Sequence, residues 1–271
     1  AEVDWRENHL AFISTLYQYR ESNHAKITGA IDFLPTVTVA TIHPSEIRLL
    51  DRYWKFSEDN HIAIRNETVE FSDLMLRNKE QQVSVNGVIS KDPDDNLFVS
   101  VKNFDLQNLN PVTDMEFLGT LNGYIDLRNY YAEKEVDSRI HVKDLYLNDF
   151  LIGNILANSV YDNAARRFSV ETTVNRLGTN IISIQGKVEP SSSDRQLALT
   201  GEFNKANLNI AEPFLAGIIT DIEGEFSGEV DISGTLGYPV LDGTCVLEDG
   251  AFHFDYLNTD YKIDEIGRAH V

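Results

Sequence analysis

Positive charge is scarce in this sequence. It has 23 Lys and Arg residues against 43 Asp and Glu residues, a net charge of −20 at pH 7. Because nucleic-acid phosphates and anionic membrane faces are bound by basic surfaces, this balance argues against nucleic acid as a partner and against docking on an anionic membrane. The acidic residues are spread along the chain, which is typical of a hydrated, self-repelling exterior.

Cysteine and long apolar runs are also scarce. The only cysteine, Cys245, excludes an internal disulfide, and its alternating apolar surroundings favour a small buried hydrophobe over a reactive thiol. No run of 18 apolar residues occurs, so the sequence predicts no transmembrane helix.

Signatures of catalysis and of cofactor binding are missing as well. The sequence has no G-x-S-x-G elbow, no Walker loop and no H-E-x-x-H motif, and its seven histidines are scattered. The densest acidic run, KDPDDN at Lys91–Asn96, has the composition of a turn, and a Ca²⁺ site there would lack EF-hand spacing. We therefore expect a protein that is not an enzyme and that binds no metal or cofactor.

Helical periodicity is weak. The best helix candidates, Glu46–Arg52 and Ile210–Gly217, are only about one or two turns long. Short segments that alternate apolar and polar residues are present instead, separated by Gly, Pro, Asn and Asp, and this pattern predicts β-strands. The segments 11–19 and 26–33, for example, flank a polar turn and predict a hairpin.

Several short motifs occur twice in the same order. GEFSGEVDI at Gly224–Ile232 matches GTLNGYIDL at Gly119–Leu127, and ISIQG at Ile182–Gly186 matches VSVNG at Val83–Gly87. The separation of about 100 residues favours a degenerate duplication, with repeats at 54–160 and 161–263, inside one continuous repetitive β-sheet segment at 1–264. A shorter echo pairs DLMLRN at Asp73–Asn78 with DLYLND at Asp144–Asp149.

The last seven residues, EIGRAHV at Glu265–Val271, lack this alternation. They resemble a translated sequencing-library adapter, so we expect an artefact there and a native chain that continues differently beyond Asp264.

The alternation places large aliphatic side chains on one face of the predicted sheet. They are Ile62, Ile64, Val83, Val85, Leu97, Val99, Val101, Ile140, Val142, Leu145, Leu147, Ile182, Ile184, Leu197, Leu199, Val230, Ile232, Leu247 and Phe252. Two interpretations stay open at this point. Two sheets can close on each other so that this face is core, the commoner arrangement in β proteins. Alternatively, a sheet that curls without closing leaves an apolar trough, which a protein exposes in order to bind something.

The C-terminal half resembles the TamB family of the AsmA-like bacterial envelope proteins. The resemblance rests on FLGTLNGYIDLR (Phe117–Arg128), on Gly153-Asn154 followed by Ala157, Val160 and Tyr161-Asp162, on the run from Glu212 to Phe252, and on DYLNTDY (Asp255–Tyr261). Its core is the order Gly-x-x-x-Gly, Ser-Gly-Thr-Leu, Pro-x-Leu-x-Gly, and it extends with decreasing clarity back to about Trp54.

The resemblance implies an all-β, elongated, curled sheet, taco-like or U-shaped, with an apolar lumen. It implies a periplasmic protein anchored in the inner membrane by an N-terminal helix. It also implies transport of phospholipids toward the outer membrane and, with an outer-membrane barrel partner (TamA-like), assembly of some outer-membrane proteins. This chain would be an internal or near-C-terminal segment that contains neither the anchor nor the strands that meet the barrel.

We therefore expect the aliphatic residues above to line a groove for phospholipid acyl chains. An alternative is an interaction module that captures strands of outer-membrane β-barrel proteins by β-augmentation, for assembly or secretion. A more distant alternative is a β-helical enzyme or adhesin that acts on polysaccharide, which aromatic platforms on the polar face would favour.

Overall fold

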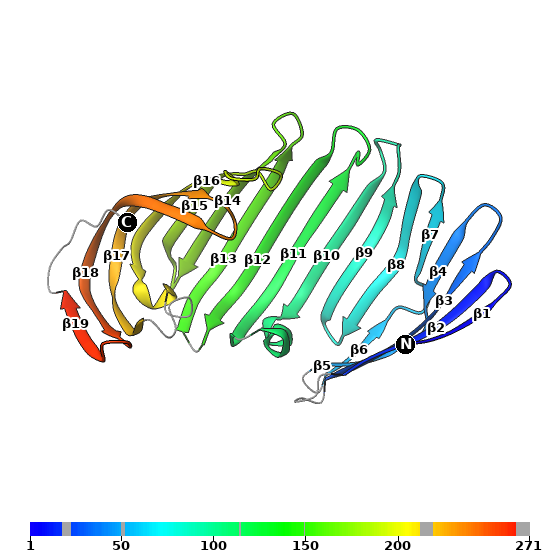
Figure 1. The fold of residues 1–271 in the computed structure, drawn as a ribbon, viewed down its shortest axis with the longest axis horizontal. Coiled ribbons are helices and arrows are strands. Elements are labelled where there is room, and N and C mark those ends of the chain that lie inside the picture. The colour runs from blue at the N-terminus through cyan, green and yellow to red at the C-terminus, as the bar shows by residue number, and fades with distance from the viewer. Residues whose placement is uncertain (18–22, 50–51, 114, 149, 212–218, 264–271) are drawn as a thin grey trace. The chain divides into compact units, whose positions relative to one another are not determined.

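The computed structural model describes residues 1–17, 23–49, 52–113, 115–148, 150–211 and 219–263. These residues contain nineteen β-strands and two short 3₁₀ helices, which confirms the prediction of an all-β chain with few helices (Figure 1). The chain divides into two compact units. Unit 1 comprises Ala1–Val112 and Thr120–Arg139, and unit 2 comprises Thr113–Gly119 and Ile140–Val271. The suspected artefact at 265–271 lies outside the described residues.

Unit 1 is an antiparallel sheet of successive hairpins. Its elements are β1 (Glu2–Arg6), β2 (His9–Tyr17), β3 (His24–Phe33), β4 (Thr38–Ile42), β5 (Glu46–Leu49), β6 (Arg52–Phe56), β7 (His61–Arg65), β8 (Thr68–Asn78), β9 (Gln81–Ile89), β10 (Asn96–Asp105), the helix η1 (Leu106–Val112) and most of β11 (Phe117–Arg128). β12 (Glu135–Leu147) has residues in both units. The predicted hairpin at 11–33 is confirmed, because β2 pairs with β3 from His9↔Asp32 to Tyr17↔His24.

The row of strands in unit 1 branches once. β3 pairs with both β4 and β5, and the two branches meet again on β8, which pairs with β7 and with β6. Asn60 stabilises the branch point. Its fully buried side chain accepts a hydrogen bond from the backbone nitrogen of Ile42 (2.9 Å) and donates one to the Ile42 carbonyl oxygen (2.8 Å). A buried amide with both groups satisfied fixes the chain where the ladder is interrupted.

Unit 2 continues the same architecture without a branch. Its elements are β13 (Phe150–Asp162), β14 (Arg167–Arg176), β15 (Thr179–Val188), β16 (Leu197–Asn207), the helix η2 (Leu208–Ala211), β17 (Ile219–Gly234), β18 (Pro239–Phe254) and β19 (Thr259–Ile263). From β13 to β19 each strand pairs antiparallel with the next. β17 and β18 are sixteen residues long, and the ribbon of β18 bends along its length (Figure 1).

The predicted helix at Glu46–Arg52 is wrong. Glu46–Leu49 forms β5, in which Ile47 is buried opposite Trp54 of β6 and Ala25 of β3. Burial against two neighbouring strands outweighs the weak helical propensity of so short a segment. Of the second predicted helix, Ile210–Gly217, only the first two residues are described, and they belong to η2, which ends at Ala211. Residues 212–218 lie outside the described residues.

Three strands carry a bulge of the same kind, and a fourth has the same local backbone conformation. At Asp73, Asn103, Asp144 and Lys205, in β8, β10, β12 and β16, the backbone φ angle is between +48° and +49°. The register is interrupted at three of them, Asp73, Asn103 and Lys205. In all four, the backbone nitrogen donates instead to a side chain of the following strand, namely Asn86, Asn122, Asn154 and Ser227 respectively, at 2.8 to 2.9 Å. The side chain thus satisfies the donor that a bulge removes from the ladder, and the bulge bends the strand.

The matched sequence motifs have matching backbone geometry. Gly87 and Gly186 have φ angles of +112° and +145°, and a Cβ atom would lie 2.0 Å from the carbonyl oxygen of Asn96 and 2.3 Å from that of Ala198, respectively. Asp105 and Asn207 follow the bulges in β10 and β16, and the side chain of each accepts a hydrogen bond from the backbone nitrogen two residues later, at the start of η1 and η2. The proposed repeat boundaries at 160 and 161 stay a prediction.

Candidate functional site

The registers give each unit one apolar face. In unit 1 a row of directly opposed residues runs Leu74↔Val85↔Val99↔Ile125 across β8 to β11. The next row, one residue along the strands, faces the other side and runs Met75↔Ser84↔Ser100↔Tyr124. Because side chains alternate between the faces of a sheet, the first row defines the apolar face and the second the opposite, more polar face, which we call the hydrated face although Ser84 and Ser100 are buried on it.

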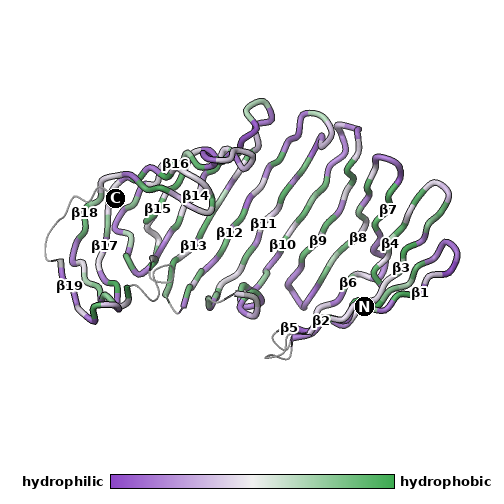
Figure 2. The backbone as a smooth tube through the Cα atoms, viewed as in Figure 1, coloured by the Kyte–Doolittle hydropathy of each residue, from purple (hydrophilic) through white to green (hydrophobic). Residues whose placement is uncertain are grey.

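Unit 2 shows the same division more sharply. On one face, Val170↔Gly186↔Leu199↔Ile232↔Leu241 crosses β14 to β18. On the other face, the row Glu171↔Gln185↔Thr200↔Asp231↔Asp242 crosses the same strands. Figure 2 shows this alternation as green and purple segments along the strands. One face of unit 2 is therefore aliphatic, and the other is polar and mostly acidic.

The registers place most of the predicted groove residues on the apolar face. In unit 1 they bring together Ile62, Ile64, Val83, Val85, Leu97, Val99 and Val101. In unit 2 they bring together Ile182, Ile184, Leu197, Leu199, Val230, Ile232 and Leu247. Phe252 lies beyond a positive-φ residue, Asp249, and its ring stacks on Tyr261 of β19 at 5.2 Å. The remaining four, Ile140, Val142, Leu145 and Leu147, lie on β12.

Burial divides these residues into two groups. Val142, Leu145, Leu147 and Ile182 are buried, with at most 9% of each residue exposed. Ile64 and Ile140 are 45% and 43% exposed, and the others are half-buried. Between β8 and β11 in unit 1, and between β13 and β19 in unit 2, the described strands form a single row of pairings, so each sheet is one layer there. Lateral neighbours in one layer shield a side chain only partly, which accounts for the half-buried state.

Cys245 lies on the apolar face of unit 2, directly opposite Gly228, whereas its neighbour Thr244 lies on the hydrated face opposite Glu229. Burial raises the pKa of the Cys245 thiol above its usual value. A protonated thiol is a poor nucleophile, which agrees with the prediction of an unreactive cysteine.

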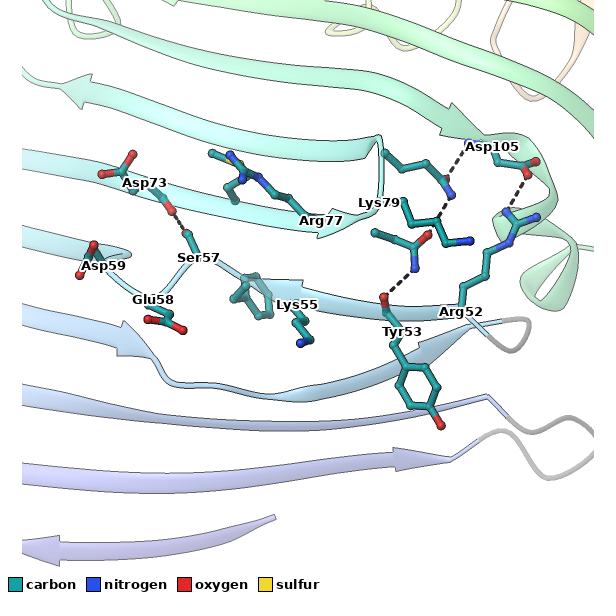
Figure 3. A pocket seen from close by; sticks show the side chains of 14 residues that line it. Arg52, Tyr53, Lys55, Ser57, Glu58, Asp59, Asp73, Arg77, Lys79 and Asp105 are labelled. Atoms are coloured by element: carbon teal, nitrogen blue, oxygen red, sulfur yellow. Dashed lines mark hydrogen bonds and ion pairs between the residues drawn. The ribbon is translucent and has the colours of Figure 1, made fainter.

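A groove of about 1030 Å³ lies in unit 1, beside β6 and β8 (Figure 3). Arg52, Lys79 and Asp105 line one end, Asp73, Glu58 and Asp59 line the other, and Lys55 and Arg77 lie between them. Arg52 forms an ion pair with Asp105, with Nη1 2.6 Å from Oδ2, and also donates to Gln107 at 3.2 Å. Sequence analysis missed this groove because β6 pairs directly with β8, although β7 lies between them in the sequence.

The structure also bears on metal binding, on the acidic turn and on membrane-spanning helices. Among the residues that the structure describes, no group of three or more His, Cys, Asp and Glu side chains is arranged to hold a metal ion. Lys91–Asn96 forms the turn between β9 and β10, as predicted, with the Asp95 nitrogen 3.3 Å from the Asp92 carbonyl oxygen. Over the same described ranges, no helix has the length and hydrophobicity needed to cross a membrane.

Comparison with known proteins adds no further identification. No family model, no curated protein and no solved structure matches this chain.

Proposed function

We propose that this chain is a segment of a periplasmic lipid-transfer conduit, in which the apolar face carries phospholipid acyl chains toward the outer membrane. The observation that supports the proposal is the half-exposed aliphatic face that the strand registers give to each unit. In unit 2, Leu199, Ile232 and Leu241 lie side by side on it, and Leu241 is 45% exposed. An exposed aliphatic strip of this kind has a free-energy cost in water that an apolar ligand relieves.

The proposed mechanism needs no fixed polar site. An acyl chain gains about 0.8 kcal/mol for each CH₂ group that it buries on the apolar face, which offsets the cost of leaving a bilayer. The residues that line the face are similar Val, Ile and Leu side chains, so no single position holds the chain much more tightly than the next. The lipid can therefore slide, while its charged headgroup stays in water.

The cellular setting of the proposal comes from the resemblance to the TamB family. In this setting an N-terminal helix outside the present sequence anchors the protein in the inner membrane. An outer-membrane barrel protein, TamA-like, receives the far end of the conduit. Phospholipids are then the cargo, and the chain itself performs no chemical reaction.

Cys245 offers a direct test of acyl-chain binding. A polarity-sensitive fluorophore, attached to Cys245 at alkaline pH so that the thiol ionises, should shift to the blue when diheptanoyl phosphatidylcholine is added below its critical micelle concentration. The matched control carries the label on the hydrated face, in a Thr244→Cys, Cys245→Ala variant, and should not shift. Equal responses at the two positions, or none at either, would contradict the proposal.

Adjacent substitutions on opposite faces of β15 provide a second test. Ile184→Asp places a charge on the apolar face, whereas Gln185→Asp places the same charge on the hydrated face. Ile184→Asp should abolish co-purification of phospholipid, measured by mass spectrometry, while Gln185→Asp should leave it unchanged. Val85→Asp and Val99→Asp should act like Ile184→Asp in unit 1. Normal lipid content and envelope integrity in several stably folded variants with Asp on the apolar face would contradict the proposal.

A further inference from the structure

Two stacked aromatic rings lie on the hydrated face of unit 1. Phe98 of β10 precedes Ser100 by two residues, and Tyr124 of β11 is directly opposite Ser100, so both side chains point to this face. The ring centroids are 5.7 Å apart with an angle of 19° between the planes, and Phe98 is 38% exposed. The pair takes no part in the apolar face and leaves aromatic surface available to a ligand.

Unit 2 has polar residues at the corresponding positions. Two cross-strand rows correspond through the matched motifs, namely Asn86↔Phe98↔Asp126 in unit 1 and Gln185↔Thr200↔Asp231 in unit 2. The amide and the carboxylate occur in both rows, but Phe98 corresponds to Thr200, whose hydroxyl donates to Asp231 at 2.9 Å. Tyr124 corresponds in the same way to Glu229. The shared architecture therefore does not require aromatic rings here, which points to a role for them outside packing.

Planar polar side chains surround Phe98. It lies directly opposite Asn86 on one side and Asp126 on the other. The Asp126 carboxylate accepts a hydrogen bond from Asn96 Nδ2 at 2.7 Å and forms an ion pair with Arg128 at 2.5 Å. Because Arg128 balances the charge of Asp126, the frame around Phe98 offers hydrogen-bonding groups with almost no net charge, on a chain whose net charge is −20.

We propose that Phe98 and Tyr124 are the stacking platform of a binding site for an uncharged polysaccharide chain. The C–H groups of a sugar ring carry small positive partial charges and pack on the negative face of an aromatic ring. The amide and carboxylate groups beside Phe98 supply donors and acceptors for sugar hydroxyls. The acidic chain repels a polyanion, so the balanced frame favours a neutral ligand. The open face of a sheet suits an extended chain that crosses several strands.

This site does not rest on the proposed conduit. Phe98 and Tyr124 alternate along their strands with Val99 and Ile125, which are directly opposed on the apolar face. The Tyr124 hydroxyl donates to Asp137 Oδ2 at 3.1 Å and so holds its ring on the hydrated side. Binding of a polysaccharide here and binding of acyl chains on the other face can therefore succeed or fail separately.

Titration calorimetry of the full chain with two uncharged probes, cellohexaose and hexa-N-acetylchitohexaose, tests the site. The parent protein should bind at least one of them and should not bind hexagalacturonate, which is a polyanion. Phe98→Thr introduces the residue of unit 2 and should weaken binding about tenfold or more, because the stacking surface is lost. Phe98→Tyr keeps the ring and should keep the affinity. If Phe98→Thr does not fold, Tyr124→Ser takes its place, with Tyr124→Phe as the variant that keeps its ring.

Phe33→Thr is the matched control. Phe33 is 39% exposed and stacks on Trp5 with centroids 5.8 Å apart and planes 18° apart, so it resembles Phe98 in exposure and in ring geometry. It lies on the apolar face, in one row with Thr38 and Ile64. Phe33→Thr should therefore bind the probes as tightly as the parent does.

Four results would overturn the proposal. The first is that the parent binds neither uncharged probe, and the second is that it binds hexagalacturonate equally well. The third is an equal affinity of the parent, Phe98→Thr and Tyr124→Ser, or an equal loss in Phe33→Thr and Phe98→Thr. The fourth is binding of a decaproline peptide at Phe98 in place of both sugars, which would assign the aromatic pair to a protein partner.

Discussion

The segment β9–β10–η1–β11 of unit 1 and the segment β15–β16–η2–β17 of unit 2 share their backbone geometry but not their surface chemistry. The shared part comprises the left-handed glycine, the bulge with its hydrogen-bonding side chain and the 3₁₀ helix. The hydrated faces differ. Ser84 and Ser100 are buried and 2.8 Å apart in unit 1, whereas the corresponding row of unit 2 brings Glu202 opposite Glu229. The comparison indicates that the bends define this architecture, while the hydrated face is free to carry different charges.

The strands that precede these two segments, β8 in unit 1 and β14 in unit 2, differ from each other. β8 has the bulge at Asp73, which donates to Asn86 of β9, whereas β14 pairs with β15 without interruption from Phe168↔Val188 to Val174↔Ile182. A bulge is thus not required for a strand to pair next to the left-handed glycine. The unbalanced charges also differ in sign, since unit 1 opposes two cations at Lys55 and Arg77 and unit 2 opposes acids.

The largest expected effect comes from the shared glycines. Gly87→Ala should destabilise unit 1 by about 2–4 kcal/mol, because the new Cβ meets a backbone carbonyl oxygen at 2.0 Å and the φ angle is +112°. Gly186→Ala should cost a similar amount in unit 2, where the corresponding distance is 2.3 Å. Chemical denaturation followed by circular dichroism measures both, and the tryptophans of unit 1 show which unit is affected.

Gly237→Ala is the matched control for both glycines. Gly237 has no atom within 4 Å of its added Cβ and no left-handed φ angle, so the stability should change by less than about 0.5 kcal/mol. If Gly87→Ala behaved like Gly237→Ala, the close approach of the strands would not be a requirement of the fold.

A swap at the bulge sharpens the comparison further. Asn103 and Lys205 occupy equivalent positions at φ angles of +49° and +48°, and asparagine tolerates this region better than lysine. Lys205→Asn should stabilise unit 2 by about 0.5–1 kcal/mol, and Asn103→Lys should destabilise unit 1 by a similar amount. The Lys205–Glu248 ion pair, at 3.6 Å and exposed, contributes little to the balance. Denaturation midpoints that move in the same direction for both swaps would show that the two bulges are not equivalent.

The strands and their faces were predictable because side-chain alternation has a period of two, and a sheet with one apolar side preserves this period. The alternation around Val83, Val99 and Ile184 is visible in the sequence without any knowledge of the pairing. The bulges were not predictable, since Asp73, Asn103 and Lys205 are ordinary polar residues in the sequence. Even so, the echo of DLMLRN and DLYLND begins at two bulge residues, Asp73 and Asp144.

The groove beside β6 and β8 was hidden for a different reason. Lys55 and Arg77 become neighbours only because β6 skips β7 and pairs with β8, and a branch of this kind depends on tertiary contacts such as those of Asn60. The strand β5 was missed because its four residues are too few to show a period. Sequence patterns therefore predicted local structure and the apolar face, and failed where non-sequential strands meet.

The smallest expected effect is a pH dependence confined to the edge of unit 2. His253 of β18 and Asp260 of β19 are directly opposed, with Nδ1 2.7 Å from Oδ1. This hydrogen bond, with the negative charge of Asp260, raises the pKa of His253 above its usual value of 6.5. A raised pKa means that the folded state binds the proton more tightly, so the stabilisation is fully present below pH 6.5 and is lost as the pH rises through the folded-state value.

Hydrogen exchange of the β18 and β19 amides measures this dependence. Protection should fall as the pH rises above 6.5 once the intrinsic exchange rates are corrected for pH, and Asp260→Asn should remove the dependence while the pairing itself remains. Exposure of the pair to solvent keeps the effect small, because water screens its charge. The amides of β14 and β15, in the same unit, have no histidine among their residues and serve as the internal control. A pH dependence of equal size in β14 and β15 would show that the change belongs to the whole unit and not to the His253–Asp260 pair.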